Sequence, residues 1–241
     1  MRKPAFILST IAVVSGLVLS TMTGMPASAL TPGIAFGASD LPTWQTNGVV
    51  YATGTISGKV LAGGTFSQIS PPSGGTGTTQ SRNALAVFNA ETGAPDSCQY
   101  TVAFAAGTPT VRAIVASPDG NTIYVGGDFT SINGIAVARL AALDPVACTV
   151  KALRTSGIGG PVLGLAATNS TVFLAGQFLT VASQVRDRLA AVNSTTGALL
   201  PWSPDVDGVA RAVAVSPDGT KVAVGGDFYN VNGNDSHGVA V

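Results

Sequence analysis

The 241-residue sequence has little charge, because only 10% of its residues are Asp, Glu, Lys or Arg, against roughly 25% in typical soluble domains. Its 12 basic and 12 acidic residues balance, so it lacks the basic footprint of a nucleic-acid-binding protein. The single histidine, His237, has neither a nucleophile nor a second histidine at metal-ligand spacing. The motifs G-x-S-x-G and H-E-x-x-H and a phosphate-binding glycine loop are missing as well. The sequence therefore contains no familiar catalytic or zinc motif.

A single hydrophobic run, AFILSTIAVVSGLVLS, lies near the start of the chain after Arg2 and Lys3. Small residues follow it and end in Ala27-Ser28-Ala29, an order typical of a secretory signal peptide. The run is shorter than the ~20 residues that span a bilayer, which argues against the alternative of an uncleaved anchor. We therefore expect a signal peptide at residues 1–29, a secreted chain at 30–241, and no membrane attachment after cleavage.

Glycine is abundant, with 30 residues, and the sequence repeats itself. The phrase SPDGNTIYVGGDF at residues 117–129 recurs as SPDGTKVAVGGDF at 216–228. The phenylalanine that closes the phrase marks four units with a period near 50 residues, and the first interval is longer because it contains inserts. These phenylalanines are Phe66, Phe129, Phe178 and Phe228.

The residues before each phenylalanine predict a strand that is covered on both faces, because apolar residues occupy consecutive positions. A glycine always stands two residues before the phenylalanine, which indicates a bulge or a close backbone approach. Pro118-Asp119-Gly120 and Asn133-Gly134 predict hairpin turns, and residues 30–241 contain no convincing amphipathic helix. The equivalent positions are Val60, Ile123, Val172 and Val222 on one face, Leu61, Tyr124, Phe173 and Ala223 on the other, and the glycines Gly64, Gly127, Gly176 and Gly226.

Four antiparallel strands in each ~50-residue unit, with both sheet faces apolar, predict an all-β fold, a β-propeller of four-stranded blades. A single blade cannot bury both faces, so neighbouring blades bury them for each other. A parallel β-helix is the main alternative, but its repeats are shorter and would not place a hairpin in every unit. The expected blade-like units are 49–104, 105–160, 161–208 and 209–241, the last of them incomplete.

The phrases SPDG, GGDF, TSING and RLAAL between residues 117 and 143 resemble the delta-60 repeat of secreted bacterial β-propellers, especially those of actinobacteria. The resemblance extends over residues 44–241 and is strongest in the second and fourth units. The first and third units have GGTF and AGQF instead of GGDF, and they have no PDG turn. The resemblance implies an extracellular propeller, often attached to adhesive or carbohydrate-binding modules, with no established activity or ligand.

The third strand of the fourth unit is expected at Val239, two residues before the end of the sequence. We favour the interpretation that the chain is a fragment of a longer propeller. In the alternative, the segment GIAFGASDLPTW at residues 33–44 supplies the missing fourth strand and closes a four-bladed ring. Trp44 precedes the first unit as Trp202 precedes the fourth, which supports this alternative. The total number of blades and the oligomeric state stay open.

The recurring charged residues are interpreted as structural. Asp128 and Asp227 share one position in the repeat, but Thr65 and Gln177 occupy it in the other units. We therefore expect these aspartates to accept hydrogen bonds from the backbone of a neighbouring blade rather than to form a site. The residues with other structural assignments are Asp119 and Asp218, expected to form turns, and Arg139 and Arg188, expected to pair with the strand aspartates.

The segment Asp205-Val206-Asp207-Gly208 resembles half of a calcium-binding loop. It lacks a third oxygen ligand and the terminal glutamate that such a loop needs. We therefore predict no cofactor, with calcium as the alternative.

Two features remain as candidate sites. Cys98 and Cys148 each follow a third strand, and in a secreted protein they predict a disulfide between adjacent blades. Their registers differ, so the geometry is open. The insert SPPSGGTGTTQSRN at residues 70–83 is interpreted first as a tolerated linker, and the alternative is a candidate loop for binding a glycan or an extracellular protein. The candidate binding residues in this loop are Ser73, Thr76, Thr78, Gln80 and Arg82.

The sequence thus favours a secreted, extracellular bacterial propeller that is not an enzyme and that serves as a binding or display scaffold. The alternative is the propeller portion of a polysaccharide-active lyase or hydrolase whose site lies in missing blades or domains. An enzyme should show titratable groups that cluster in one unit and break the repeat, whereas most polar residues here keep its register.

Overall fold

Every regular element that the structure describes is a β-strand. The computed structural model describes residues 43–153, 155 and 157–241. This part of the chain contains no helix, and so none that is long and apolar enough to cross a membrane. The predicted signal peptide, and residues 33–42 of the segment that could close a ring, lie outside the described residues.

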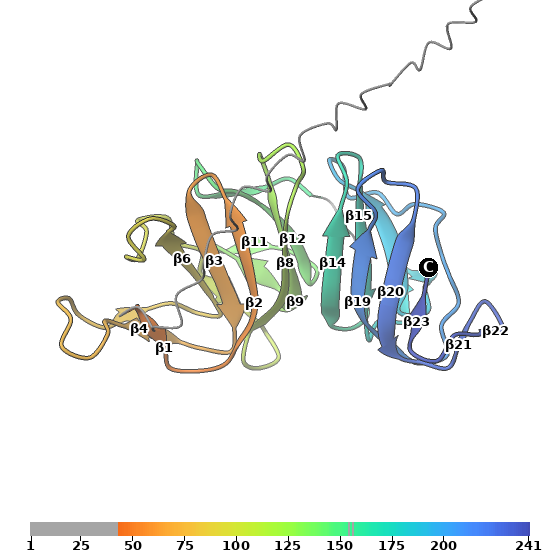
Figure 1. The fold of residues 1–241 in the computed structure, drawn as a ribbon, viewed down its shortest axis with the longest axis horizontal. Helices are drawn as coiled ribbons and strands as arrows, with labels where there is room; N and C mark the ends of the chain where they lie inside the picture. The colour runs from red at the N-terminus through yellow and green to blue at the C-terminus, as the bar shows by residue number, and fades with distance from the viewer. Residues whose placement is uncertain (1–42, 154, 156) are drawn as a thin grey trace, which may run out of the picture. The chain divides into compact units, whose positions relative to one another are not determined.

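The longer strands form four antiparallel sheets that follow one another along the chain, here called units 1 to 4 (Figure 1). Each sheet begins with two long strands joined by a tight turn, and a third strand pairs with the second. These sheets are the blades of a β-propeller, as the sequence predicts. Unit 1 contains β2 (Val50–Ile56), β3 (Lys59–Gly64) and β6 (Leu85–Asn89); unit 2 contains β8 (Thr110–Ala116), β9 (Ile123–Asp128), β12 (Leu140–Asp144) and β13 (Thr149–Lys151); unit 3 contains β14 (Val162–Ala167), β15 (Thr171–Gly176) and β18 (Leu189–Asn193); unit 4 contains β19 (Val209–Val215), β20 (Val222–Asp227) and β23 (Val239–Ala240).

Short hairpins connect the second and third strands of each unit. Asn133-Gly134 and Asn232-Gly233 form their turns with positive φ at both residues, as type I′ hairpins require. In unit 3 the same turn is made by Ala182 and Ser183, also at positive φ, a pair that carries no such signal in the sequence. The short strands are β1 (Gln45–Thr46), β4 (Gln68–Ser70) and β5 (Gln80–Ser81); β7 (Val102–Ala103), β10 (Ser131–Ile132) and β11 (Ile135–Ala136); β16 (Thr180–Val181) and β17 (Gln184–Val185); β21 (Asn230–Val231) and β22 (Asn234–Asp235).

The predicted fourth strand is complete only in unit 2, where β13 pairs with β12. In units 1 and 3 it is reduced to single bridges, Phe88 to Pro95 and Val192 to Leu199. Pro95 and Pro201 lie in these segments, and proline has no N–H with which to extend a ladder. The described part of unit 4 ends with its third strand.

The glycine two residues before each repeated phenylalanine lies opposite a β-bulge. The first strand of unit 2 shifts register between Val111 and Ala113 where it passes Gly127, and units 1, 3 and 4 have the same shift. A Cβ added at Gly127 would collide with the carbonyl oxygen of Thr110. This confirms the predicted bulge and close backbone approach, which leave room only for glycine.

Neighbouring units bury their faces against each other. The first strands β2, β8, β14 and β19 pack side by side in this order (Figure 1). Leu61 of unit 1 lies in one cluster with Ile123 and Val125 of unit 2, and Tyr124 of unit 2 lies in the next cluster with Val172 and others of unit 3. Each unit therefore turns one face toward the preceding unit and the other toward the following one.

Leu140→Ala should lower the free energy of unfolding by about 2–5 kcal/mol, because the substitution leaves a cavity between units 2 and 3. Leu140 is 1% exposed there. Val146 is 77% exposed, and Val146→Ala, the control, should change stability by no more than about 0.5 kcal/mol. Urea unfolding of the purified variants measures both values. Equal effects of the two substitutions would contradict inter-unit packing as the source of stability.

Candidate binding surface

The candidate loop projects from a small three-stranded sheet in the order β1–β4–β5. Ser73, Thr76 and Thr78 are exposed in the loop between β4 and β5. A hydrogen bond between Ser70 Oγ and Thr79 Oγ1 (3.1 Å) closes the base of the loop. Gly77 has φ +121°, and a Cβ built on it would lie 3.1 Å from Cζ2 of Trp44. The loop therefore presents hydroxyl groups to solvent beside a tryptophan ring.

Gln80 and Arg82 lie at the base of this loop. Gln80 begins β5 and is half-buried, and Arg82 is only 6% exposed. Arg82 donates from Nη1 to the carbonyl oxygen of Ser81 (2.7 Å) and from Nη2 to Oε1 of Gln80 (2.6 Å). Burial lowers the pKa of the Arg82 guanidinium. This arginine supports the loop from within, and three of the five candidate residues remain free to meet a partner.

An apolar groove adjoins the loop on the open face of unit 1. Trp44 packs beside Phe66, Ile69 and Ala86. The groove has a volume of about 660 Å³. Its apolar lining comes from Trp44, Val50, Val60, Ala62 and Phe88.

A second, smaller cavity of about 330 Å³ lies between units 2 and 3. Its polar groups already have partners in the protein. Tyr124 donates its hydroxyl proton to the carbonyl oxygen of Ser194 (3.0 Å), and burial raises its pKa. Lys151 Nζ donates to the Asn121 carbonyl oxygen (2.7 Å) and to Thr122 Oγ1 (2.9 Å). The Tyr124 bond joins the two units, and the Lys151 bonds lie within unit 2.

The two strand aspartates pair with arginines, not with backbone groups as expected. Arg211 Nε donates to Asp227 Oδ2 (2.7 Å), and this bond lowers the pKa of Asp227. In unit 2, Asp128 lies 4.0 Å from Arg112 Nε and 3.5 Å from Arg139 Nε. Arg112 and Arg211 are the bulged residues of their first strands. In the sequence, an arginine and an aspartate occur together at the same two repeat positions in units 2 and 4, and this coincidence is the signal that could have predicted the pairs.

The other repeated arginine position connects consecutive units. Arg139 Nη1 donates to the carbonyl oxygen of Ile158 (2.6 Å), and Arg188 Nη1 donates to that of Val206 (2.8 Å). Arg139 also lies near Asp128, as expected, but Arg188 was expected to pair with an aspartate and instead binds backbone. Unit 3 has Gln177 at the aspartate position, which explains the difference.

Asp119 and Asp218 stabilise turns, whereas Asp207 joins the segment before β19 to the start of β21. Asp119 accepts from Ser117 Oγ and Asn121 N, and Asp218 has the equivalent contacts. Asp207 accepts from Asn230 Nδ2 and from the backbone N–H groups of Asn230 and Tyr229, which lowers its pKa. The described residues contain no cluster of three or more His, Cys, Asp and Glu side chains that could hold a metal ion.

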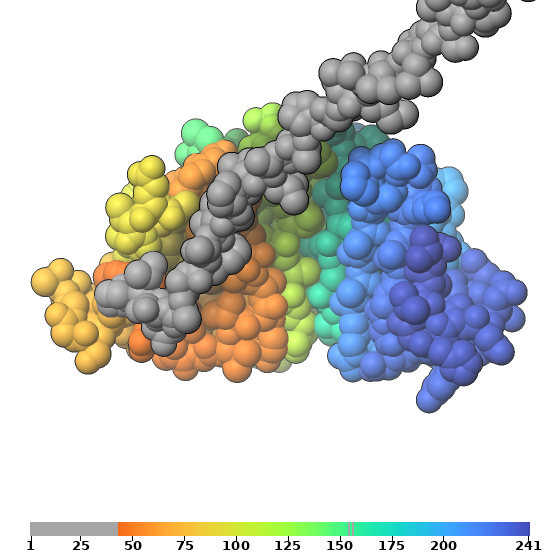
Figure 2. Space-filling view, in the orientation of Figure 1, coloured from red at the N-terminus to blue at the C-terminus, as the bar shows by residue number. Residues whose placement is uncertain are grey.

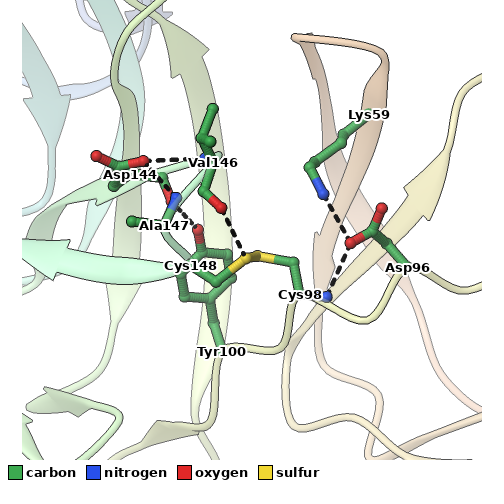
Figure 3. Close-up of a disulfide and its surroundings, with 8 residues drawn as sticks. All are labelled: Lys59, Asp96, Cys98, Tyr100, Asp144, Val146, Ala147 and Cys148. Carbon is green, nitrogen blue, oxygen red and sulfur yellow. Dashed lines mark hydrogen bonds and ion pairs between the residues drawn. A yellow bond between two sulfur atoms is a disulfide. The ribbon is translucent and has the colours of Figure 1, made fainter.

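The predicted disulfide between Cys98 and Cys148 is present and joins units 1 and 2 (Figure 3). Two contacts lie beside it. Tyr100 donates its hydroxyl proton to the carbonyl oxygen of Asp144 (2.7 Å), while burial, followed by the charges of Asp144 and Asp96, raises the pKa of Tyr100 to about 12. Lys59 Nζ donates to Asp96 Oδ1 (2.7 Å), which also accepts from Cys98 N (2.8 Å). The disulfide and the Tyr100 bond connect units 1 and 2, and the Lys59–Asp96 pair holds the segment before Cys98 to β3 of unit 1.

Tandem antiparallel blades, bulged first strands and mutual burial of neighbouring faces define a β-propeller domain. Residues 85–208, slightly more than half of the chain, match the family described as the Rax2 C-terminal beta propeller domain. The chain belongs to this family. No curated protein matches the sequence. A chain in the solved structure "Crystal Structure of Mitotic Checkpoint Complex" is similar, with 13% identity and a TM-score of 0.43, over 73% of this chain and 60% of that one.

Replacing both Cys98 and Cys148 with serine should lower the free energy of unfolding by about 2–4 kcal/mol, because the disulfide closes a long loop and restricts the unfolded chain. The two residues are 50 positions apart. Urea unfolding of the wild type in strong reductant provides the control, and its midpoint should fall to that of the double variant. A wild-type midpoint unaffected by reductant would argue against a stabilising bond.

Asp96→Asn should destabilise the protein by about 0.5–1 kcal/mol at neutral pH by removing the ion pair with Lys59. The hydrogen bond from Lys59 is the main cause of the lowered pKa of Asp96, followed by that from Cys98 N. Because the folded-state pKa is depressed, this stabilisation is present above the unfolded-state pKa of about 3.9 and is lost as the pH falls through the folded-state value.

Urea unfolding at about pH 7 and about pH 2.5 measures this change. The difference between wild type and Asp96→Asn should be smaller at the lower pH, because the stabilisation declines as the pH falls below the unfolded-state pKa towards the folded-state value. Asparagine keeps an oxygen that can accept from Cys98 N, so the variant isolates the charge. A difference that stays constant between the two pH values would contradict the assignment.

Proposed function

We propose that this chain is a secreted, non-catalytic propeller of the delta-60 type, which serves as a binding or display scaffold outside a bacterial cell. The signal peptide that the sequence predicts at residues 1–29 supports secretion. The disulfide between Cys98 and Cys148 also supports it, because structural disulfides persist mainly in oxidising compartments outside the cytosol.

One observation carries the scaffold assignment: the charged residues that recur in the repeat are engaged in holding the fold together. Asp227 pairs with Arg211, and Asp207 joins the segment before β19 to β21. Arg139 and Arg188 each donate to the backbone of the next unit. Catalysis requires titratable groups that converge on a reacting atom, whereas these groups are distributed in register and contact other groups of the fold.

The loop between β4 and β5 is the surface that we assign to binding, and a neutral glycan is the partner that suits its chemistry. Its exposed side chains, Ser73, Thr76 and Thr78, are hydroxyls that can both donate and accept hydrogen bonds. Trp44 lies beside Gly77 and adds an aromatic surface with an apolar body. The loop carries no exposed charge in its described residues 71–79, which fits an uncharged ligand.

Alanine at Ser73, Thr76 and Thr78 together should weaken glycan binding by at least about tenfold, since each lost hydrogen bond contributes roughly 0.5–1.5 kcal/mol. The protein is recovered from the culture medium of a bacterial host, and binding is measured on an array of neutral glycans and then by calorimetry. The control replaces Thr101, Thr108 and Thr195, which are also exposed, and should bind like the wild type. Equal loss in both variants, or no binding to any glycan, would refute this role of the loop.

A further inference from the structure

Unit 2 places two arginines around a single aspartate. Arg112 is the bulged residue of β8, Asp128 ends β9, and Arg139 immediately precedes β12. Arg112 Nε lies 4.0 Å from Asp128 Oδ2, and Arg139 Nε lies 3.5 Å from Asp128 Oδ1. Both Nε atoms are buried, and neither has a hydrogen-bond partner in the described part of the chain. Two guanidinium groups therefore face one carboxylate, and the cluster keeps a net positive charge.

The equivalent arginine and aspartate of unit 4 form a closed pair. Arg211 Nε donates to Asp227 Oδ2 at 2.7 Å, and Arg211 Nη2 contacts the same oxygen. This guanidinium spends its donors on its own aspartate, whereas that of Arg112 makes no hydrogen bond with Asp128. The same two repeat positions thus give a saturated ion pair in unit 4 and an unsaturated cluster in unit 2.

An aromatic ring of the preceding unit explains why Arg112 stays away from Asp128. Strands β2 and β8, drawn in orange and light green in Figure 2, pack side by side. Tyr51 is the bulged residue of β2, and its ring centre lies 4.9 Å from the guanidinium of Arg112. A cation is attracted to the face of such a ring. Unit 3 has Leu163 at this position, so the unit before Arg211 offers no aromatic ring there.

The second arginine of the cluster is fixed in a similar way. Arg139 Nη1 donates to the carbonyl oxygen of Ile158 (2.6 Å), and its guanidinium lies 5.9 Å from the ring centre of Phe104, which follows β7. Arg139 Nη2 and both terminal nitrogens of Arg112 have no acceptor among the described residues. The two side chains are 26% and 34% exposed. Packing therefore orients guanidinium groups whose remaining N–H donors are open to a ligand.

We propose that Arg112 and Arg139 form a binding site for the carboxylate of a uronic acid residue in an acidic glycan. The planar guanidinium presents parallel N–H groups that match the two oxygens of a carboxylate, and such pairs form strong hydrogen bonds. The cluster has one more positive charge than negative charges. This excess matches a ligand that brings one carboxylate to the site.

A sugar acid suits the cluster better than an acidic peptide does. A uronic acid holds its carboxylate on a rigid ring, so less conformational entropy is lost on binding than with a glutamate side chain. The rings of Tyr51 and Phe104 lie beside the guanidinium groups, and aromatic rings offer an apolar surface to the C–H face of a sugar. This site is built from other strands than the uncharged loop between β4 and β5, and its ligand differs in charge.

Calorimetric titration of the purified chain with an oligogalacturonate, its methyl ester and polyglutamate tests the proposal. The oligogalacturonate should bind. The methyl ester keeps the sugar rings but has no charge, so it should bind at least about tenfold more weakly, because hydrogen bonds to charged groups are the stronger ones. Polyglutamate supplies carboxylates without sugar rings and should bind more weakly than the oligogalacturonate.

Substitutions in the cluster separate binding from a structural role. Arg112→Gln should weaken oligogalacturonate binding by about 10–100-fold. Arg211→Gln is the matched control and should bind like the wild type, because Arg211 is already paired with Asp227. Asp128→Asn removes the carboxylate that competes with the ligand, so it should tighten binding by about two- to fivefold, the effect of one partly exposed charge. Tyr51→Leu copies the environment of Arg211 and should weaken binding, because Arg112 is then free to pair with Asp128.

Urea unfolding shows that each variant is folded before it is titrated. Alanine at Ser73, Thr76 and Thr78 should leave oligogalacturonate binding unchanged, so failure of this site and failure of the neutral-glycan loop are distinguishable. No binding of the oligogalacturonate, equal losses in Arg112→Gln and Arg211→Gln, or weaker binding by Asp128→Asn would overturn the proposal. Polyglutamate that binds more tightly than the oligogalacturonate would replace the sugar acid with an acidic peptide and overturn it as well.

Discussion

The structure depends on the mutual burial of apolar sheet faces by neighbouring units. Each second strand carries apolar residues on both faces, such as Ile123 and Tyr124, and these enter two different clusters. A three- or four-stranded sheet can cover neither face by itself. The repeat must therefore supply a face and its complement in every unit, and this requirement explains why the same residues recur along the chain.

Glycine makes this close stacking possible in two distinct ways. Gly127 and its equivalents admit the bulge of the first strand, and Gly126 and Gly63 admit a valine from the next unit. The dipeptide Gly-Gly therefore serves one contact within a unit and one contact between units. Unit 3 has Ala175-Gly176 instead of Gly-Gly. The glycine at the bulge, Gly176, is kept because backbone atoms opposite it cannot move away. Alanine replaces only the glycine that faces the next unit, where the side chain opposite can be a smaller one.

The polar residues show where prediction from the sequence reached its limit. The turn aspartates could be assigned because Pro-Asp-Gly is local chemistry, and the structure places Asp119 in such a turn. Arg112 and Arg211 occur in the same two units as Asp128 and Asp227, but only the pairing of the first and second strands places each arginine beside its aspartate. Arg82 belongs to the loop that the sequence offers as a candidate for binding, and the structure buries its side chain at the base of that loop. The residues Ala182 and Ser183 do not favour a type I′ turn, so the sequence gives no signal for it. The pairing of the flanking strands β16 and β17 imposes the turn.

The sequence alone determined the fold class, the four phenylalanines that mark the units, the glycine bulges and the pairing of Cys98 with Cys148. All of these depend on periodicity, on residue chemistry at fixed spacing or on there being only two cysteines. The tertiary structure decided which face of each unit meets its neighbour, how Val111 and Gly63 fit together, and which residues such as Val50 and Val239 stay exposed. Those properties arise from contacts between residues that are far apart in the chain, and such contacts exist only after the sheets have stacked.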